Sequence, residues 1–269
     1  MCFQMAKQSS PRTMTTVATS WDIIHALEQL QGAGVTELAE HLDMPKGTVY
    51  THLATLKEQK YVVKQDGKYQ LGLHFLSLGE FVKKDNALFN AGRSEIERLA
   101  EETDEYVHLV TEEHGDLIYL HEARGQNAVG KNYFEKKLEK PGYLHSSAYG
   151  KAILAYLPET RVEEIIEESG LPQRTEKTLT SRDELFEELD SIREQGYAQN
   201  DEEEIFGTRA VGAPILDKNE TVLGAVSITK PTSRMQGDDF HKTVPDLVTS
   251  AANVIEVNIQ TMRNEEIRH

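Results

Sequence analysis

The stretch from Thr36 to Leu71 constrains the fold of this 269-residue chain more than any other segment. Thr36 is a suitable N-cap for a short helix, and apolar residues at helical spacing predict a second helix over residues 45–59. Asp43, Met44 and Pro45 separate the two helices, and proline suits the first turn of the second. An amphipathic segment at residues 17–31 predicts one more helix before them. Three short helices, the last two joined by a tight break, are therefore expected.

A β-hairpin is predicted directly after these helices. Val62 and Val63 form the first apolar strand, and Tyr69 and Leu71 the second. Asp66-Gly67 lies between them, a dipeptide that favours positive φ and tight hairpin turns. Three helices followed by such a hairpin are typical of a winged helix-turn-helix.

The charge of the chain is distributed unevenly. The formal net charge is −16, yet residues 1–72 hold seven basic and seven acidic side chains, so all of the excess lies in residues 73–269. Within residues 44–72, five lysines face one Glu and one Asp. An acidic body repels a polyanion, so any contact with nucleic acid is expected to be confined to this basic segment. Such acidity also fits a cytoplasm of high ionic strength, as in a salt-loving microbe.

The predicted helix over residues 45–59 has one polar face. Helices of this kind read base edges in the major groove, while wing lysines contact phosphates. We therefore expect double-stranded DNA as a partner, with these side chains at the interface: Lys46, Thr48, Tyr50, Thr51, Lys64 and Lys68. A helical domain that docks proteins remains the alternative, and a shallow dependence of affinity on salt would favour it.

Several classes of protein are disfavoured by the sequence. No run approaches the roughly 18 apolar residues of a membrane-spanning helix, and the first 14 residues lack the apolar core of a secretory signal. A cytoplasmic protein is expected. The single cysteine, Cys2, cannot form an internal disulfide or a cysteine-based metal site.

The rest of the chain predicts an α+β domain built on an antiparallel sheet. The apolar face of residues 73–87 predicts a linker helix that packs against a neighbouring chain. Helices before and after hairpin-linked strands are typical of this class. The predicted helices are residues 88–102, 147–156, 162–168, 181–195 and 240–262; the predicted strands are residues 107–111, 117–120, 129–134, 197–199, 209–216 and 222–229.

Enzyme chemistry finds little support in the sequence. His108, His114, His121 and His145 lack the helical zinc-binding spacing, although a zinc site from scattered His and Glu stays open. Ser146-Ser147 lacks the glycines of a nucleophile elbow. The carboxylates of residues 201–204 are interpreted as a solvated loop. No catalytic residue, metal or cofactor is expected; the alternative is a metabolite-binding or hydrolytic enzyme with an appended helical domain.

Several separated motifs resemble the IclR family of transcription regulators. They are Pro45-Lys46-Gly47-Thr48-Val49, Leu144-His145-Ser146-Ser147-Ala148-Tyr149-Gly150-Lys151-Ala152, Gly196-Tyr197-Ala198, Ala213-Pro214-Ile215 and Gly224-Ala225-Val226-Ser227-Ile228. The resemblance implies a tail (residues 1–16), a winged helix-turn-helix (17–72), a linker helix (73–87) and a GAF-like effector-binding and oligomerisation domain (88–269). It also implies homodimers or homotetramers that control carbon-source or aromatic-compound genes and sense a sugar acid, organic acid or aromatic acid.

Carried over position by position, the resemblance nominates an effector site: Phe134, Ala148, Tyr149, Asn200, Ala210, Ser227 and Thr229. Ser227 and Thr229 also alternate with apolar neighbours, so both hydroxyls project from one face of a strand, although that face could equally be open to solvent. Two positions depart from the family. Asn200 stands where relatives often have Asp, and Thr51 stands where they often have Arg in the recognition helix.

Overall fold

The computed structural model describes residues 13–126, 128 and 142–266. The chain divides into two compact units, residues 1–82 and 83–269, and each is described by itself. The predicted strand at residues 129–134 lies outside the described residues. Elements of the first unit, including the helix that crosses into the second, are α1 (Thr15–Gln29), α2 (Val35–His41), α3 (Lys46–Glu58), β1 (Val62–Gln65), β2 (Lys68–Leu71) and α4 (His74–Asp85).

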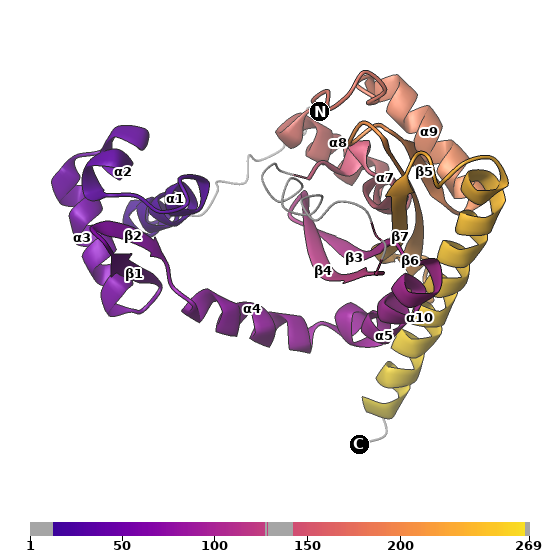
Figure 1. The fold of residues 1–269 in the computed structure, drawn as a ribbon, viewed down its shortest axis with the longest axis horizontal. Coiled ribbons are helices and arrows are strands. Elements are labelled where there is room, and N and C mark those ends of the chain that lie inside the picture. The colour runs from indigo at the N-terminus through magenta and orange to yellow at the C-terminus, as the bar shows by residue number, and fades with distance from the viewer. Residues whose placement is uncertain (1–12, 127, 129–141, 267–269) are drawn as a thin grey trace, which may run out of the picture. The chain divides into compact units, whose positions relative to one another are not determined.

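The second unit alternates helices and strands. Its α-helices and strands are labelled in Figure 1. The elements are α5 (Ala87–Thr103), β3 (Tyr106–Glu113), β4 (Asp116–Arg124), the 3₁₀ turn η1 (Leu144–Ser146), α7 (Ala148–Leu154), α8 (Glu159–Ser169), α9 (Arg182–Gln195), β5 (Ala198–Asp201), β6 (Thr208–Leu216), β7 (Val222–Pro231), the π-helical turn η2 (Asp239–Thr243) and α10 (Val244–Glu266). The α+β class expected from the sequence is confirmed.

The three helices of the first unit share one apolar core. Val49, Leu53 and Leu56 of α3 are buried against Ile23 and Leu27 of α1 and their neighbours. The chain leaves α2 through a left-handed residue, Asp43, at φ 50°, and enters α3 after Pro45. This short break holds α2 and α3 in the helix-turn-helix arrangement.

The hairpin forms as its turn dipeptide predicts. Asp66 and Gly67 both have positive φ, 51° and 83°, and β1 pairs antiparallel with β2 from Val62–Leu71 to Gln65–Lys68. Tyr69 also bridges Ala33 in the segment between α1 and α2. This bridge attaches the wing to the helical core at Tyr69, in addition to its two chain connections.

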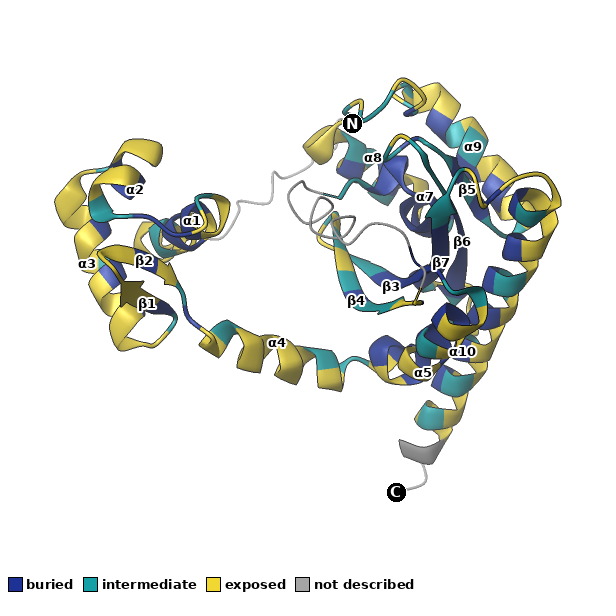
Figure 2. Ribbon diagram, in the orientation of Figure 1, coloured by how far each residue is buried: buried dark blue, intermediate teal, exposed yellow. Residues whose placement is uncertain are grey.

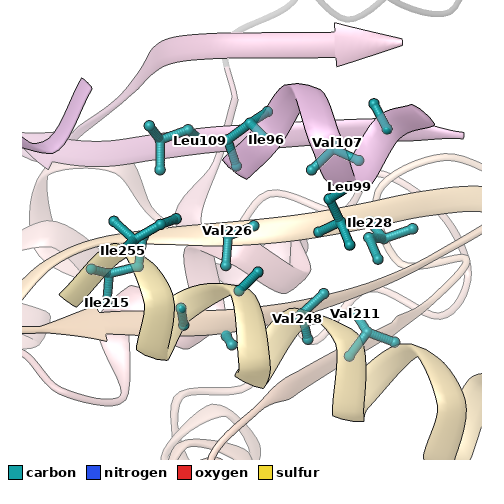
Figure 3. Close-up of a cluster of buried hydrophobic side chains, with 14 of the residues drawn as sticks. Ile96, Leu99, Val107, Leu109, Val211, Ile215, Val226, Ile228, Val248 and Ile255 are labelled. Carbon is teal, nitrogen blue, oxygen red and sulfur yellow. The ribbon is translucent and has the colours of Figure 1, made fainter. Parts of the chain in front are cut away.

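A five-stranded antiparallel sheet organises the second unit, in the order β4-β3-β7-β6-β5. Successive side chains of a strand point to opposite faces. One face is apolar and packs on α5 and α10, as the labelled side chains of Figure 3 show: Ile96, Leu99, Val107, Leu109, Val211, Ile215, Val226, Ile228, Val248 and Ile255. Burying this face supplies the main driving force for folding the unit, since roughly 25 cal/mol accompanies each Å² of apolar surface removed from water.

The opposite face of the sheet is covered only in part by helices. Val110, Ala198 and Ala225 on this face join a second apolar core with α7, α8 and α9. Gly212 allows the start of α7 to approach, because a Cβ there would lie 2.9 Å from the Ala148 carbonyl carbon and from the Tyr149 nitrogen. The remainder of the face carries polar side chains.

Helix α4 differs from every other described helix longer than a turn in burying none of its residues. In Figure 2 it is coloured as exposed or intermediate along its length. Leu73 is 80% exposed and Phe81 72% exposed, and Leu76, Leu78 and Val82 are also exposed. Among the described residues, no helix is long and apolar enough to cross a membrane.

Candidate functional site

The outer face of α3 presents polar side chains to solvent. Its inner face is fixed in the core, so the alternate positions Lys46, Thr48, Tyr50 and Thr51 are exposed, with Tyr50 58% exposed. The Thr51 hydroxyl donates a hydrogen bond to the carbonyl of Gly47, which occupies its donor within the helix. The other three side chains lie at the N-terminal half of the helix, where its dipole also favours phosphate.

Both wing lysines flank the turn and are exposed. The Lys64 ammonium lies 5.0 Å from the centroid of the Tyr69 ring, and the Lys68 ammonium lies 3.9 Å from the Glu37 carboxylate. The latter pair is exposed on both sides, so water screens it and it competes weakly with a phosphate. The wing therefore offers two cations to an anionic partner.

The polar face of the sheet is built from two rows of residues that cross the strands. In the first row Tyr106 pairs with Thr229, Thr229 with Ala210, and Ala210 with Asn200. In the second row His108 pairs with Ser227, and Ser227 with Gly212. We call these residues the polar face: Tyr106, His108, Asn200, Ala210, Gly212, Ser227 and Thr229.

Two hydroxyls of the polar face lack partners. Ser227 Oγ and Thr229 Oγ1 are buried, and neither has a hydrogen-bond partner among the described residues. A buried polar group without a partner costs about 1–3 kcal/mol, so such groups in a folded protein call for an explanation. Ala210 and Gly212 pair with Thr229 and Ser227 on the neighbouring strand and have small or no side chains, and the start of α7 packs over Gly212. Two donors are therefore available to a molecule bound on this face.

Tyr149, at the start of α7, belongs to a chain of hydrogen bonds beside the polar face. Its hydroxyl lies 3.1 Å from Glu204 Oε1 and 2.7 Å from the Tyr119 hydroxyl. An ionised carboxylate only accepts, so Tyr149 donates to Glu204 and Tyr119 donates to Tyr149. The chain fixes the position of the Tyr149 ring, which lies 5.9 Å from the His108 ring.

His108 is buried at the centre of the polar face. Its Nε2 lies 3.1 Å from Glu122 Oε2 on β4, the residue directly opposite it in the sheet. A carboxylate in this position favours an imidazole that carries a proton on Nε2. The sequence alone predicts neither His108 nor Glu122 as part of an effector site.

Asn200 is held by the protein itself. Its Nδ2 donates to the carbonyl of Ser146 at 2.6 Å, and its Oδ1 accepts from the Glu203 amide at 3.2 Å. The first bond ties β5 to the η1 turn that precedes α7, and the second holds the loop that follows β5. That Asn200 contacts the effector stays a prediction. In the structure its side chain also holds β5 against the η1 turn.

The other nominated effector residues are brought together. Ala210, Ser227 and Thr229 lie in adjacent rows of the sheet, and Ala148 and Tyr149 lie over Gly212. Phe134 lies outside the described residues. The sequence missed Tyr106, Tyr119, Glu122 and Glu204, because only the pairing of distant strands and the packing of α7 place them beside the hydroxyls.

The interpretation of residues 201–204 as a solvated loop is wrong for part of that loop. Glu203 is buried, and its carboxylate lies 2.8 Å from the ammonium of Lys151, which is only 1% exposed. Lys151 also pairs with Glu188 of α9 at 2.9 Å. Burial raises the pKa of Glu203, and the neighbouring Lys151 opposes that rise. The buried Lys151 thus binds part of the acidic run, although 52 residues separate it from Glu203 in the sequence.

The histidines singled out in the sequence do not assemble a metal site in the described part of the chain, where no group of three or more His, Cys, Asp or Glu is placed to hold a metal ion. His121 pairs with Glu97 at 3.4 Å. His145 Nε2 lies 3.2 Å from the Pro172 carbonyl oxygen, within hydrogen-bond distance.

Comparison with known families accounts for both units. The model described as the IclR helix-turn-helix domain matches residues 17–66, and the model described as bacterial transcriptional regulator IclR C-terminal matches residues 82–256. Together the two models span most of the chain, in the order that the winged helix and the sheet domain follow here.

Known proteins resemble the chain over three quarters or more of its length. A probable HTH-type transcriptional regulator ArcR from Halobacterium salinarum is 43% identical over 260 residues, covering 96% of this chain and 98% of the relative. The glycerol operon regulatory protein of Streptomyces coelicolor is 33% identical over 205 residues, covering 75% and 78%. The crystal structure of the Thermotoga maritima IclR is similar with a TM-score of 0.70 at 26% identity, covering 92% and 99%.

Proposed function

The chain belongs to the IclR family of transcriptional regulators, and from this premise we propose that it is a cytoplasmic, ligand-responsive regulator of carbon-source or aromatic-compound genes. It binds double-stranded operator DNA through α3 and the wing, and a small-molecule effector on the polar face. The observation that carries the effector proposal is the pair of buried hydroxyls, Ser227 and Thr229, without partners among the described residues. The family consists of regulators, and no residue is assigned a catalytic role.

The proposed effector is a sugar acid, an organic acid or an aromatic acid. Hydroxyl donors on Ser227 and Thr229, with His108 beside them, suit a ligand rich in carboxylate and hydroxyl oxygens. The relative that regulates a glycerol operon supports control of carbon-source genes. Ala148, Tyr149 and Ala210 are proposed as the adjacent walls, and Asn200 as the residue that holds one edge in place.

Removing both hydroxyls should separate ligand binding from stability. The double variant Ser227→Ala/Thr229→Val is expected to unfold at nearly the wild-type temperature, because no hydrogen bond within the described residues is lost. The Kd for the effector should rise roughly tenfold or more, since each lost hydrogen bond contributes about 0.5–1.5 kcal/mol, and more to a charged ligand. The measurement is a thermal-shift screen of sugars, sugar acids and aromatic acids, in which bound ligand raises the melting temperature.

Ser250→Ala supplies the matched control, because Ser250 is exposed on α10, away from the polar face. It should retain the full ligand-induced shift. An effector that stabilises the double variant as strongly as the wild type would place the site elsewhere in the molecule.

We also propose that α4 joins two copies of the chain in a homodimer, the unit from which a homotetramer is assembled. Five large apolar side chains are exposed on one short stretch, and exposed apolar surface of this kind marks an interface: Leu73, Leu76, Leu78, Phe81 and Val82. A twofold dimer pairs the same face of each copy.

The variant Leu76→Glu/Phe81→Glu tests the dimer proposal. Burying a Leu or Phe contributes about 1.5–3 kcal/mol, so loss of two from each copy should raise the dissociation constant at least 100-fold. Light scattering after size exclusion measures the mass. Ser77→Glu introduces charge on the same helix outside the apolar set and should leave the dimer intact. A Leu76→Glu/Phe81→Glu protein that stays dimeric would refute the interface.

A further inference from the structure

A cavity in the sheet domain is lined by residues outside the polar face. Its volume is about 310 Å³, and it is enclosed by the β3–β4 turn, the η1 turn and the end of α8. None of its lining residues belongs to the polar face. The volume is comparable to that of small-molecule sites, which begin near 300 Å³.

The floor of this cavity is apolar. Leu144, Leu154 and Ile165 line it and are themselves buried, so the floor belongs to the protein core and is shaped before any ligand arrives. Asp116 and Glu168 line the cavity from exposed positions at its mouth. An apolar interior with two carboxylates at its entrance favours a ligand with an apolar body and a positive end.

His145 supplies a polar group inside the cavity. It lines the cavity and is only 3% exposed. Its Nε2 lies 3.2 Å from the carbonyl of Pro172, which only accepts, so Nε2 carries the proton. Burial lowers the pKa of His145, which keeps the ring neutral. Nδ1 of this tautomer is then a hydrogen-bond acceptor.

The described charged side chains that line the cavity are both acidic. None of the described lining side chains is Lys or Arg. Arg161 is nearby, but its guanidinium is bonded to Glu112 at 2.9 Å and to Glu164 at 3.0 Å. Arg174 lies over the Tyr143 ring, 5.7 Å from its centroid, and the Lys151 ammonium is bonded to Glu188 and Glu203. The described lining groups that can bond a ligand are therefore two carboxylates, the His145 imidazole and the hydroxyls of Tyr143 and Ser169.

We propose that this cavity is a second ligand site, and that it binds organic cations, namely primary ammonium or guanidinium compounds with an apolar body. The apolar body rests on Leu144, Leu154 and Ile165, and the cationic N–H groups are bound by His145 Nδ1 and the carboxylates of Asp116 and Glu168. A regulator with both sites senses an organic cation separately from the effector of the polar face.

The test compares two probes of the same shape and opposite charge, 2-phenylethylammonium and 3-phenylpropionate, by titration calorimetry on the full chain. We expect saturable binding of the ammonium probe and at least tenfold weaker binding of the carboxylate. Asp116→Asn/Glu168→Gln should lower the affinity for the ammonium probe roughly tenfold, because each exposed carboxylate contributes up to about a fivefold increase in affinity. Glu113→Gln/Glu167→Gln, which removes two exposed carboxylates outside the lining, should leave binding unchanged.

Two further measurements localise the probe. Ile166→Trp, at a half-buried lining position, should fill the cavity and abolish binding, whereas Ser227→Ala on the polar face should have no effect. The ¹⁵N resonance of His145 Nδ1 should shift on titration with the ammonium probe. Equal affinities for the two probes, or ammonium binding that survives Asp116→Asn/Glu168→Gln, would overturn the proposal.

Discussion

Loss of the two wing lysines should lower the affinity for operator DNA roughly 100-fold at low salt. Lys64 and Lys68 are exposed on either side of the turn, and the hairpin that holds them is fastened to the core by the Tyr69–Ala33 bridge. A charge-assisted hydrogen bond contributes about 1.5 kcal/mol or more, and each phosphate contact adds about one unit to the slope of log affinity against log salt. For Lys64→Ala/Lys68→Ala we therefore expect that slope to become shallower by about two.

The measurement is a fluorescence anisotropy titration with duplex DNA from the upstream region of the gene, repeated over a range of salt concentrations. Lys218→Ala/Lys242→Ala removes the same charge from exposed positions of the sheet domain and serves as the control. Lys46→Ala/Tyr50→Ala, on the exposed face of α3, should lower the affinity for operator DNA more than the affinity for unrelated DNA. A wing variant with unchanged affinity and salt slope would favour the protein-docking reading of this domain.

The winged helix was predictable because its signals are local. Pro45 marks the start of α3, Asp66-Gly67 sets the hairpin turn, and helical spacing gives the buried face of each helix. Ser181 caps α9 by accepting a hydrogen bond from the Glu184 amide. Helix ends moved by up to four residues; α10, for example, ends at Glu266 rather than at residue 262. Ends depend on weak terminal hydrogen bonds, so spacing alone does not fix them.

The effector site was predictable only in part, because it depends on long-range pairing. The alternation along β7 placed Ser227 and Thr229 on one face, but it did not say which strand lies beside them. Strand β7 lies between β3 and β6, and its pairing with β3 brings His108 beside Ser227. The buried state of Glu203 was missed for the same reason: an acidic run resembles a solvated loop until Lys151 is placed next to it.

Lys151→Met should destabilise the sheet domain by about 3–5 kcal/mol at pH 7. The substitution keeps most of the buried stem and removes the charge that neutralises Glu203 and Glu188. Breaking a buried ion pair on one side costs this much because the remaining charge is left in the interior without its partner. Lys151 lies in α7, so the loss also loosens the helix that places Ala148 and Tyr149 over the sheet.

The deficit of Lys151→Met should shrink as the pH falls. Burial already raises the pKa of Glu203, and loss of Lys151 removes the main opposing effect, so the carboxyl takes up a proton more readily in the folded state than in the unfolded chain. A folded-state pKa above the unfolded value means that stability falls as pH rises between the two, and returns as pH drops through the same window. Urea unfolding, followed by circular dichroism at pH 7 and pH 5.5, measures the difference from wild type. Adding Glu203→Gln to Lys151→Met should recover much of the loss at pH 7 and abolish this pH dependence, whereas a deficit below about 1 kcal/mol, or one equal at both pH values, would show that the buried pair does not hold α7.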